Sequence, residues 1–375
     1  MSYTEQMENA LFQQWDEFDD YNEDYKALIE AINSGHYFRS FGDGLLDILR
    51  KKKPGLTADK AAKYIEEICK NTGIPISTIG SPNTLDNWFK NNKRPKKGED
   101  SREKMFALAF ALKLTPDETA ELFHKVYHDR AFDYRNANEI IYYFCLYNQK
   151  TRQEARRLIN SISVSEISTE DLTVYTAKIK TEVEAFSDET ALLSYIFRHG
   201  HNLTKKNVTA KQTVEKLIAK ARSKAKEETE LQQTDDAFRG KARESNNFVY
   251  EVITGLSVTG VKGTKTLFKN ANLPGEIKKR FPEALTLSKK DPTYEELRKL
   301  IILLFSYCYW YKKQSKNTVI ELDDYIEEIN VHLNESGFSL MYYGNPYDWL
   351  FLYCALSDRP LDTFRGLIAE VLSEE

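Results

Sequence analysis

Cysteine, proline and glycine are scarce in this sequence of 375 residues, which holds four, ten and 16 of them. The cysteines lie far apart, with no Cys-x-x-Cys spacing for zinc and no dense framework for disulfides. We expect them to be reduced residues of the core: Cys69, Cys145, Cys308 and Cys354. The shortage of proline and glycine leaves long stretches without helix breakers.

Long hydrophobic runs are also missing. The longest strongly apolar run, LIILLFSYCYWY at 300–311, is too short to cross a bilayer. The first residues, MSYTEQMENALF, lack the basic and then apolar order of a secretion signal. These two absences predict a cytoplasmic protein that makes no membrane contact.

Neither sign of charge dominates, because 53 Lys and Arg residues stand against 57 Asp and Glu, a formal net charge of −4. A nucleic-acid site in such a chain has to be a local basic patch. The first 31 residues hold nine Asp or Glu and one Lys, which predicts an acidic N-terminal arm.

Helical periodicity runs through most of the chain and predicts an all-α fold. Apolar residues recur every three or four positions over 56–71, 101–114, 117–127, 138–148, 152–159, 170–185, 189–198, 209–226, 293–312, 321–333 and 346–372. One stretch, VTGVKGTKTLF at 258–268, has a β-like rhythm, and its glycines suit a loop or a short ribbon.

The clearest functional signal is SPNTLDNWFKNNKRPKKGED at 81–100. Ser81 is typical of a helix N-cap, and Pro82 fits the first helical position because its missing N–H has no helical partner there. Leu85 and Trp88 fall on one face and leave the polar residues on the other. The pattern predicts a helix and basic loop over 81–97.

The polar residues of this stretch match the chemistry of a protein–DNA interface. Asparagine bonds adenine bidentately in the major groove, serine and threonine bond bases or phosphates, and basic side chains bond phosphates. The predicted DNA-binding residues are Ser81, Asn83, Thr84, Asn87, Lys90, Lys93, Arg94, Lys96 and Lys97. A secondary basic patch would extend the phosphate contacts: Arg50, Lys51, Lys52 and Lys53. The alternative is a basic loop that is only solvated surface.

A predicted helix at 57–73 precedes this stretch, and two predicted packing helices follow it, which is a helix-turn-helix order. Over residues 40–127 the sequence resembles the lambda-repressor-like, or Xre-type, helix-turn-helix regulators, with TLDNWFKNNKRPKKG in the place of the recognition helix and its following loop. The resemblance implies a helix in the major groove and transcription regulation. The turn, NTGIPISTIGS, is longer than that family's tight turn.

An internal repeat is the second pattern. Residues 136–159 align without gaps to 345–368, an offset of 209 that pairs identical asparagine, cysteine and arginine residues. Upstream, an offset of 192 pairs 85–112 with 277–304. These matches predict a degenerate tandem duplication, and the alternative is chance similarity, because amphipathic helices share apolar spacing without sharing ancestry. The arrangement, with NPYDW near the C-terminus, also resembles a poorly characterised group of multi-helix regulators from Gram-positive bacteria and their mobile elements.

The sequence predicts four regions: an acidic arm at 1–39, a helix-turn-helix DNA-binding domain at 40–160, a helical connector at 161–246 and a drifted second helical copy at 247–375. It predicts no enzyme, cofactor or metal. Gly260 is not followed by the Lys-Ser/Thr of a phosphate loop, and Lys125 stands where a zinc-protease helix needs glutamate between its histidines.

Two functional hypotheses follow from the sequence. The first is a sequence-specific DNA-binding transcriptional regulator, with structured RNA or an RNA–DNA hybrid as alternative ligands. Either a protein partner or a second copy of the chain is the expected protein contact. The second is a non-enzymatic effector or interaction subunit of a phage-defence or retron-like system, whose helices bind a protein or nucleic-acid partner.

Overall fold

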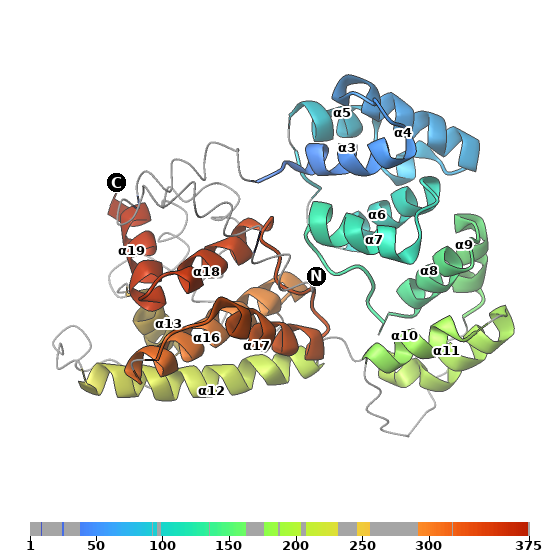
Figure 1. Cartoon of the computed structure of the whole chain (residues 1–375). Helices are drawn as coiled ribbons and strands as arrows, with labels where there is room; N and C mark the ends of the chain where they lie inside the picture. Colours follow the sequence, from blue (N-terminus) through green and yellow to red (C-terminus); the bar gives the residue numbers. More distant parts are fainter. Residues whose placement is uncertain are drawn as a thin grey trace. The chain divides into compact units, whose positions relative to one another are not determined.

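The computed structural model describes residues 9, 25, 38–91, 93–95, 99–134, 136–162, 176–186, 188–203, 208–231, 246–255, 292–316 and 318–373. Every regular element within these ranges is helical, which confirms the predicted all-α fold (Figure 1). No described helix is long and apolar enough to span a membrane. The chain forms two compact units: the N-terminal unit, residues 39–206, and the C-terminal unit, residues 1–38 with 207–375.

The N-terminal unit begins with three helices and a 3₁₀ turn, and two of these helices belong to the predicted helix-turn-helix. They are α3 (Phe41–Lys52), α4 (Ala58–Thr72), the 3₁₀ turn η2 (Ile76–Thr78) and α5 (Pro82–Lys90). The sequence predicts α4 and α5 but not α3, because Gly42 and Gly44 weaken the helical pattern of its first turn. The Ser40 N-cap, whose side chain accepts a hydrogen bond from the Asp43 amide, is the signal that reveals this helix.

Helices α3 and α5 approach closely because Gly42 has no side chain. A Cβ atom at Gly42 would lie 2.2 Å from the Trp88 carbonyl oxygen and 3.0 Å from the Cα of Phe89. Phe41 packs edge-on against Trp88, with ring centroids 5.2 Å apart. Leu85 and Trp88 are buried, so α5 is anchored through its apolar face.

The rest of the N-terminal unit is built from α6 (Glu99–Ala111), α7 (Pro116–Glu121), the π-helical turn η3 (Leu122–Tyr127), α8 (Ala137–Tyr147), α9 (Arg152–Asn160), α10 (Thr176–Glu184) and α11 (Glu189–Leu203). Capping boxes at Thr115 and Thr151 begin α7 and α9. One hydrophobic core joins α3 through α11. Helices α10 and α11 of the predicted connector therefore pack with the N-terminal unit.

The C-terminal unit consists of α12 (Val208–Leu231), α13 (Asn246–Thr254), α16 (Tyr294–Ser315), α17 (Leu322–Glu335), α18 (Pro346–Leu356) and α19 (Pro360–Ser373). Helices α12 and α16 pack along each other. The periodic segment 346–372 is two helices, because Pro360 cannot continue α18 and instead takes a place in the first turn of α19. The segment 258–268 lies outside the described residues.

A partly buried arginine closes the loop before α8 in the N-terminal unit. Arg102 donates from Nε and Nη2 to the two carboxylate oxygens of Glu139, at 2.9 and 2.7 Å. The same guanidinium bonds the carbonyl oxygens of Arg130 and Ala131 at 2.9 and 3.1 Å. Glu139 also accepts a hydrogen bond from the Asp133 amide at 2.6 Å.

The same arrangement recurs before α18 in the C-terminal unit. Arg298 donates to both carboxylate oxygens of Asp348 at 2.7 Å. It also bonds the carbonyl oxygens of Ser339 and Leu340 at 3.1 and 3.0 Å. Asp348 accepts a hydrogen bond from the Tyr342 amide at 2.9 Å.

The positions of the two networks support the hypothesis of a duplicated module. Each carboxylate, loop carbonyl and loop amide is displaced by 209 residues, the offset predicted from sequence, and the N-cap asparagines Asn136 and Asn345 follow the same offset. The arginines, however, are 196 residues apart, so the predicted offset of 192 is wrong by one helical turn at Arg102. Residues 277–291 of that alignment lie outside the described residues.

All four cysteines are buried and free, as predicted. Burial raises the pKa of the Cys69 thiol to about 11 and that of Cys145 to about 12. Burial likewise raises the pKa of Cys308 to about 11 and takes that of Cys354 well above its usual range. The thiols are therefore uncharged near neutral pH, and the thiolate is the reactive form.

We expect the folded protein to resist iodoacetamide at about pH 8, because little thiolate is present below a raised pKa and the sulfur atoms are shielded. After denaturation all four cysteines should be alkylated. Intact-mass spectrometry before and after denaturation measures both states. An adduct on the folded protein would contradict the burial of the modified cysteine.

Candidate nucleic-acid interface

Helix α5 begins as the sequence predicts and ends earlier. Ser81 is its N-cap and accepts a hydrogen bond from the Thr84 amide, with Pro82 in the first turn. The last helical residue is Lys90, so a helix extending to residue 97 is wrong. Two asparagines after Lys90 are weak helix formers, and Pro95 disfavours the helical conformation of the residue before it.

The polar face of α5 carries a row of amides. Asn83, Asn87 and Asn91 are spaced by four residues, so they lie one above the other on the helix. The Asn87 amide donates to Asn83 at 3.5 Å, and the Asn91 amide donates to Asn87 at 2.5 Å. Asn91 is absent from the predicted site, although the repeat of asparagine every fourth residue is visible in the sequence.

The hydroxyl residues of the predicted site lie at the start of the helix. Ser81 is exposed and Thr84 is half-buried, and their side-chain oxygens are 2.9 Å apart. The Ser81 hydroxyl therefore already caps the helix. Its exposed position still leaves it at the edge of the amide row.

The basic residues of the predicted site have different environments. Lys90 pairs with Asp86 at 2.9 Å on the surface of α5. Lys93 is exposed and makes no ion pair with a described residue, while its backbone amide bonds the Asn87 carbonyl at 3.1 Å. Lys96 and Lys97 lie outside the described residues.

Arg94 is turned toward the core of the unit. Its Nη1 lies 3.1 Å from Nδ1 of His128, whose Nε2 lies 3.1 Å from the Lys125 carbonyl oxygen. A carbonyl only accepts, so Nε2 donates to it and Nδ1 accepts from Arg94. Arg94 therefore fixes the chain after α5 against the end of η3.

A groove of about 650 Å³ lies beside these residues. It is lined by Thr84, Asn87, Trp88, Lys93, Arg94, Pro95, Glu99, Asp100, Ser101 and Lys104. Lys104 adds a positive charge to the groove and is absent from the predicted DNA-binding site. The groove thus combines polar residues of α5, the chain after it and the first turns of α6.

The secondary basic patch has partners within the N-terminal unit. Lys51 pairs with Glu121, and Lys52 pairs with Glu118 at 2.9 Å, which ties the end of α3 to α7. Burial opposes ionisation of Glu118, but the bonds from Lys52 and from the Thr115 amide lower its pKa. Two further contacts hold Arg50 on the Leu56 carbonyl oxygen and Lys53 over the Tyr64 ring.

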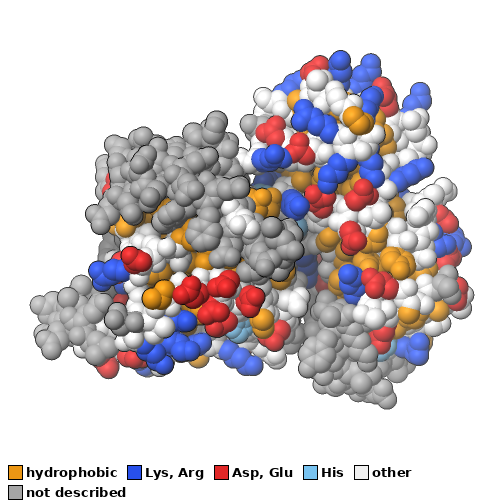
Figure 2. Space-filling view, viewed as in Figure 1, with side chains coloured by type: hydrophobic (Ala, Val, Ile, Leu, Met, Phe, Trp, Pro, Cys, Tyr) orange, Lys and Arg blue, Asp and Glu red, His pale blue; other side chains and the backbone are white. Residues whose placement is uncertain are grey.

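The two units differ in charge. Residues 39–206 contain 28 Lys and Arg against 23 Asp and Glu, whereas the rest of the chain contains 25 against 34. The excess is concentrated in residues 39–97, which contain 13 basic and six acidic residues. Figure 2 shows basic side chains spread over the N-terminal unit, with acidic ones among them.

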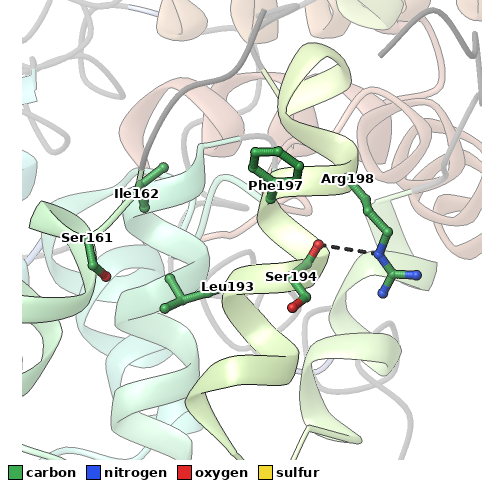
Figure 3. Close-up of a pocket in the computed structure, with 6 residues that line it drawn as sticks. All are labelled: Ser161, Ile162, Leu193, Ser194, Phe197 and Arg198. Atoms are coloured by element: carbon green, nitrogen blue, oxygen red, sulfur yellow. Dashed lines mark hydrogen bonds between the residues drawn. The ribbon is translucent and has the colours of Figure 1, made fainter. Parts of the chain in front are cut away.

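A second pocket, of about 320 Å³, lies between the end of α9 and α11 (Figure 3). Its lining is Ser161, Ile162, Leu193, Ser194, Phe197 and Arg198, with the Arg198 Nε donating to the Ser194 carbonyl oxygen at 3.3 Å. This lining contains serine hydroxyls but no histidine or carboxylate that could act as a general base. Within the described ranges, no group of three or more His, Cys, Asp or Glu residues is placed to hold a metal ion.

No protein-family model, curated protein or solved structure matches this chain. The resemblance to helix-turn-helix regulators therefore stays a hypothesis carried by residues 40–127. The structure supplies for this hypothesis an anchored helix with an amide row, beside a groove lined by basic and acidic residues.

Proposed function

We propose that the protein is a DNA-binding regulator whose N-terminal unit places the exposed face of α5 in the major groove. The amide row of Asn83, Asn87 and Asn91 is the observation that carries this proposal. It lies on a helix whose opposite face is anchored by the buried Leu85 and Trp88. A rigid helix of this kind is how helix-turn-helix proteins present side chains to base edges.

The dimensions of α5 support the proposal. Nine residues make a helix about 14 Å long, and the major groove is about 12 Å wide. Residues four apart are separated by about 6 Å along the axis, so the three amides span several base pairs. An asparagine amide can both donate to and accept from adenine, and hydrogen bonds between exposed amides exchange readily for such contacts.

The basic residues around α5 support a second part of the interface. Lys93 is exposed, and the ion pair between Lys90 and Asp86 lies on the surface of α5, so both lysines are available to phosphates. Arg94 would contribute indirectly, by holding Lys93 in place, because its contact with His128 fixes the chain segment that carries Lys93. Phosphate contacts of this type fix orientation, while base contacts give specificity.

Two substitutions should separate these roles. We expect Asn87→Ala to reduce discrimination between selected and scrambled duplexes by about 1–3 kcal/mol and to leave the salt dependence unchanged. We expect Lys93→Ala to weaken binding to every duplex and to lower the salt slope by about one unit. Fluorescence anisotropy titrations at several salt concentrations measure both effects.

Matched controls lie on α9 of the same unit, where Asn160 and Arg156 are exposed. Asn160→Ala and Arg156→Ala remove an amide and a positive charge away from α5, so neither should change binding. If the wild-type protein binds no duplex at low salt, or if Asn87→Ala keeps full sequence preference, α5 is not a recognition helix.

A further inference from the structure

The outer face of α17 is strongly acidic. The helix itself contains no Lys or Arg. Five exposed carboxylates lie on it and a sixth is its N-cap: Asp323, Asp324, Glu327, Glu328, Glu335 and the N-cap Glu321. The opposite face packs into the core through Tyr325, Ile326, Ile329 and Leu333. Figure 2 shows acidic side chains gathered on the C-terminal unit in the area where Figure 1 places α17.

These carboxylates are not used to hold the fold together. None of the six forms a salt bridge with any residue that the structure describes, in contrast to Glu118 and Glu121 of α7, which both pair with lysines. The helix dipole favours Asp323 and Asp324 in the first turn, but it gives no stabilisation to Glu328 and opposes a negative charge at Glu335 in the last turn.

A buried polar group lies beneath the acidic face. Tyr309 of α16 is 6% exposed, and its hydroxyl oxygen has no hydrogen-bond partner among the described residues. Its ring packs against Tyr325 of α17, with centroids 5.6 Å apart. Burial is the main reason that the pKa of Tyr309 is raised to about 12, and four nearby carboxylates contribute to the same rise: Glu328, Asp324, Asp323 and Glu321. The hydroxyl therefore lies close to the acidic residues.

A lysine of the same chain already lies over the Tyr309 ring. The ammonium nitrogen of Lys313 lies 5.4 Å from the centroid of the Tyr309 ring, a cation–π contact. Lys313 makes no salt bridge with the carboxylates of α17. The surface thus accepts a lysine ammonium over the aromatic ring, while the carboxylates of α17 form no ion pair with a described residue.

One apolar side chain interrupts the acidic face. Val331 is 54% exposed and follows Glu321, Asp324 and Glu328 at the three- and four-residue spacing of a single helical stripe. An exposed valine within a charged stripe adds an apolar contact to the ionic ones. This combination suits a polypeptide better than a small cation.

We propose that the acidic face of α17 is a docking surface for a lysine- and arginine-rich segment of a partner protein. The partner's basic side chains would pair with the carboxylates, one of them would replace Lys313 over Tyr309, and an apolar residue would cover Val331. A nucleic acid is disfavoured by the negative charge of this face. The proposal is independent of DNA binding by α5, which lies in the other unit.

The test measures binding of a short labelled peptide rich in lysine and arginine, with one leucine, to the intact chain. We expect binding that weakens as salt is added, and no binding of the same peptide with glutamine in place of its basic residues. Asp324→Asn with Glu328→Gln should weaken binding by about five-fold or more. Asp358→Asn with Asp362→Asn, which removes equal charge from exposed positions outside α17, should change it less than two-fold by the same reasoning.

Two single substitutions sharpen the test because their effects have opposite signs. Tyr309→Phe should weaken peptide binding, because the partner's cation over the ring would also give the Tyr309 hydroxyl a hydrogen bond that it lacks among the described residues. The melting temperature should not fall, since no hydrogen bond to a described residue is lost. Lys313→Ala should tighten binding by about two-fold or more, because it removes the internal cation from the ring. Both variants keep the core packing of α16.

Several results would overturn the proposal. Equal affinity of all variants for the peptide would show unspecific attraction. A dimer that dissociates when Asp324 and Glu328 are neutralised, with no peptide binding, would assign the face to a second copy of the chain. Calcium or magnesium binding that is lost in the same variant, without peptide binding, would assign it to a cation.

Discussion

We expect Arg298→Met to lower the free energy of unfolding of the C-terminal unit by about 3–5 kcal/mol, because it leaves the Asp348 carboxylate buried without its charge partner. Arg298 is 4% exposed and Asp348 is fully buried, so water cannot replace the lost bonds. The loop carbonyls of Ser339 and Leu340 would lose their donor as well. Urea denaturation followed by circular dichroism measures the change.

Two further variants show whether the loss comes from the unpaired charge. Arg298→Met combined with Asp348→Leu should recover part of the stability, because removing both charges leaves no buried ion. Arg359→Met breaks the exposed pair with Asp362 and should change stability by less than about 1 kcal/mol. A small effect of Arg298→Met would contradict the burial of this pair.

The second large effect is expected from a single methyl group. Gly42→Ala places a Cβ atom 2.2 Å from the Trp88 carbonyl oxygen, a contact that only a backbone shift between α3 and α5 can relieve. Overpacking typically costs about 1–3 kcal/mol, and a backbone atom yields less readily than a side chain. We expect a net loss of about 2 kcal/mol or more, together with impaired DNA binding as α5 is displaced.

Gly44→Ala is the matched control on the same helix. The three atoms nearest to its Cβ would belong to the Val126 side chain, the first of them at 3.2 Å, and this side chain can adjust. Both substitutions gain up to about 1 kcal/mol of helix propensity, so the difference between them isolates the contact with α5. Thermal melting of the two variants gives this difference, and equal melting temperatures would refute the close approach at Gly42.

Local signals in the sequence were sufficient to predict α5 and its face. Ser81 and Pro82 determine where the helix begins, and Leu85 and Trp88 occupy the positions that turn inward. The end of the helix was less predictable, because the pattern of charge continues beyond Lys90 while the helix does not. Nothing in the sequence distinguishes the exposed Lys93 from Arg94, which bonds His128.

Contacts between distant residues account for most of what the sequence does not reveal. Lys52 and Glu118 are separated by 66 residues, and neither neighbourhood indicates the other. The polar residues around Arg102 predict an exposed side chain in the first turns of a helix. In the structure its guanidinium is instead surrounded by carboxylates and carbonyl oxygens. The two halves of the repeat could be aligned at α8 and α18, where the alignment has no gaps. Upstream, more residues separate Arg298 from Ser339 than separate Arg102 from Arg130, so the predicted alignment of this part was shifted.

The arginine network also has an evolutionary consequence. The contacts shared by the two networks involve one arginine and one carboxylate, together with backbone carbonyls and an amide, which any residue other than proline supplies at those positions. Two copies of such a module can therefore lose nearly all side-chain identity and keep the same loop closed. Surface residues are free to diverge under selection, so one descendant module can carry a basic helix while the other carries an acidic one.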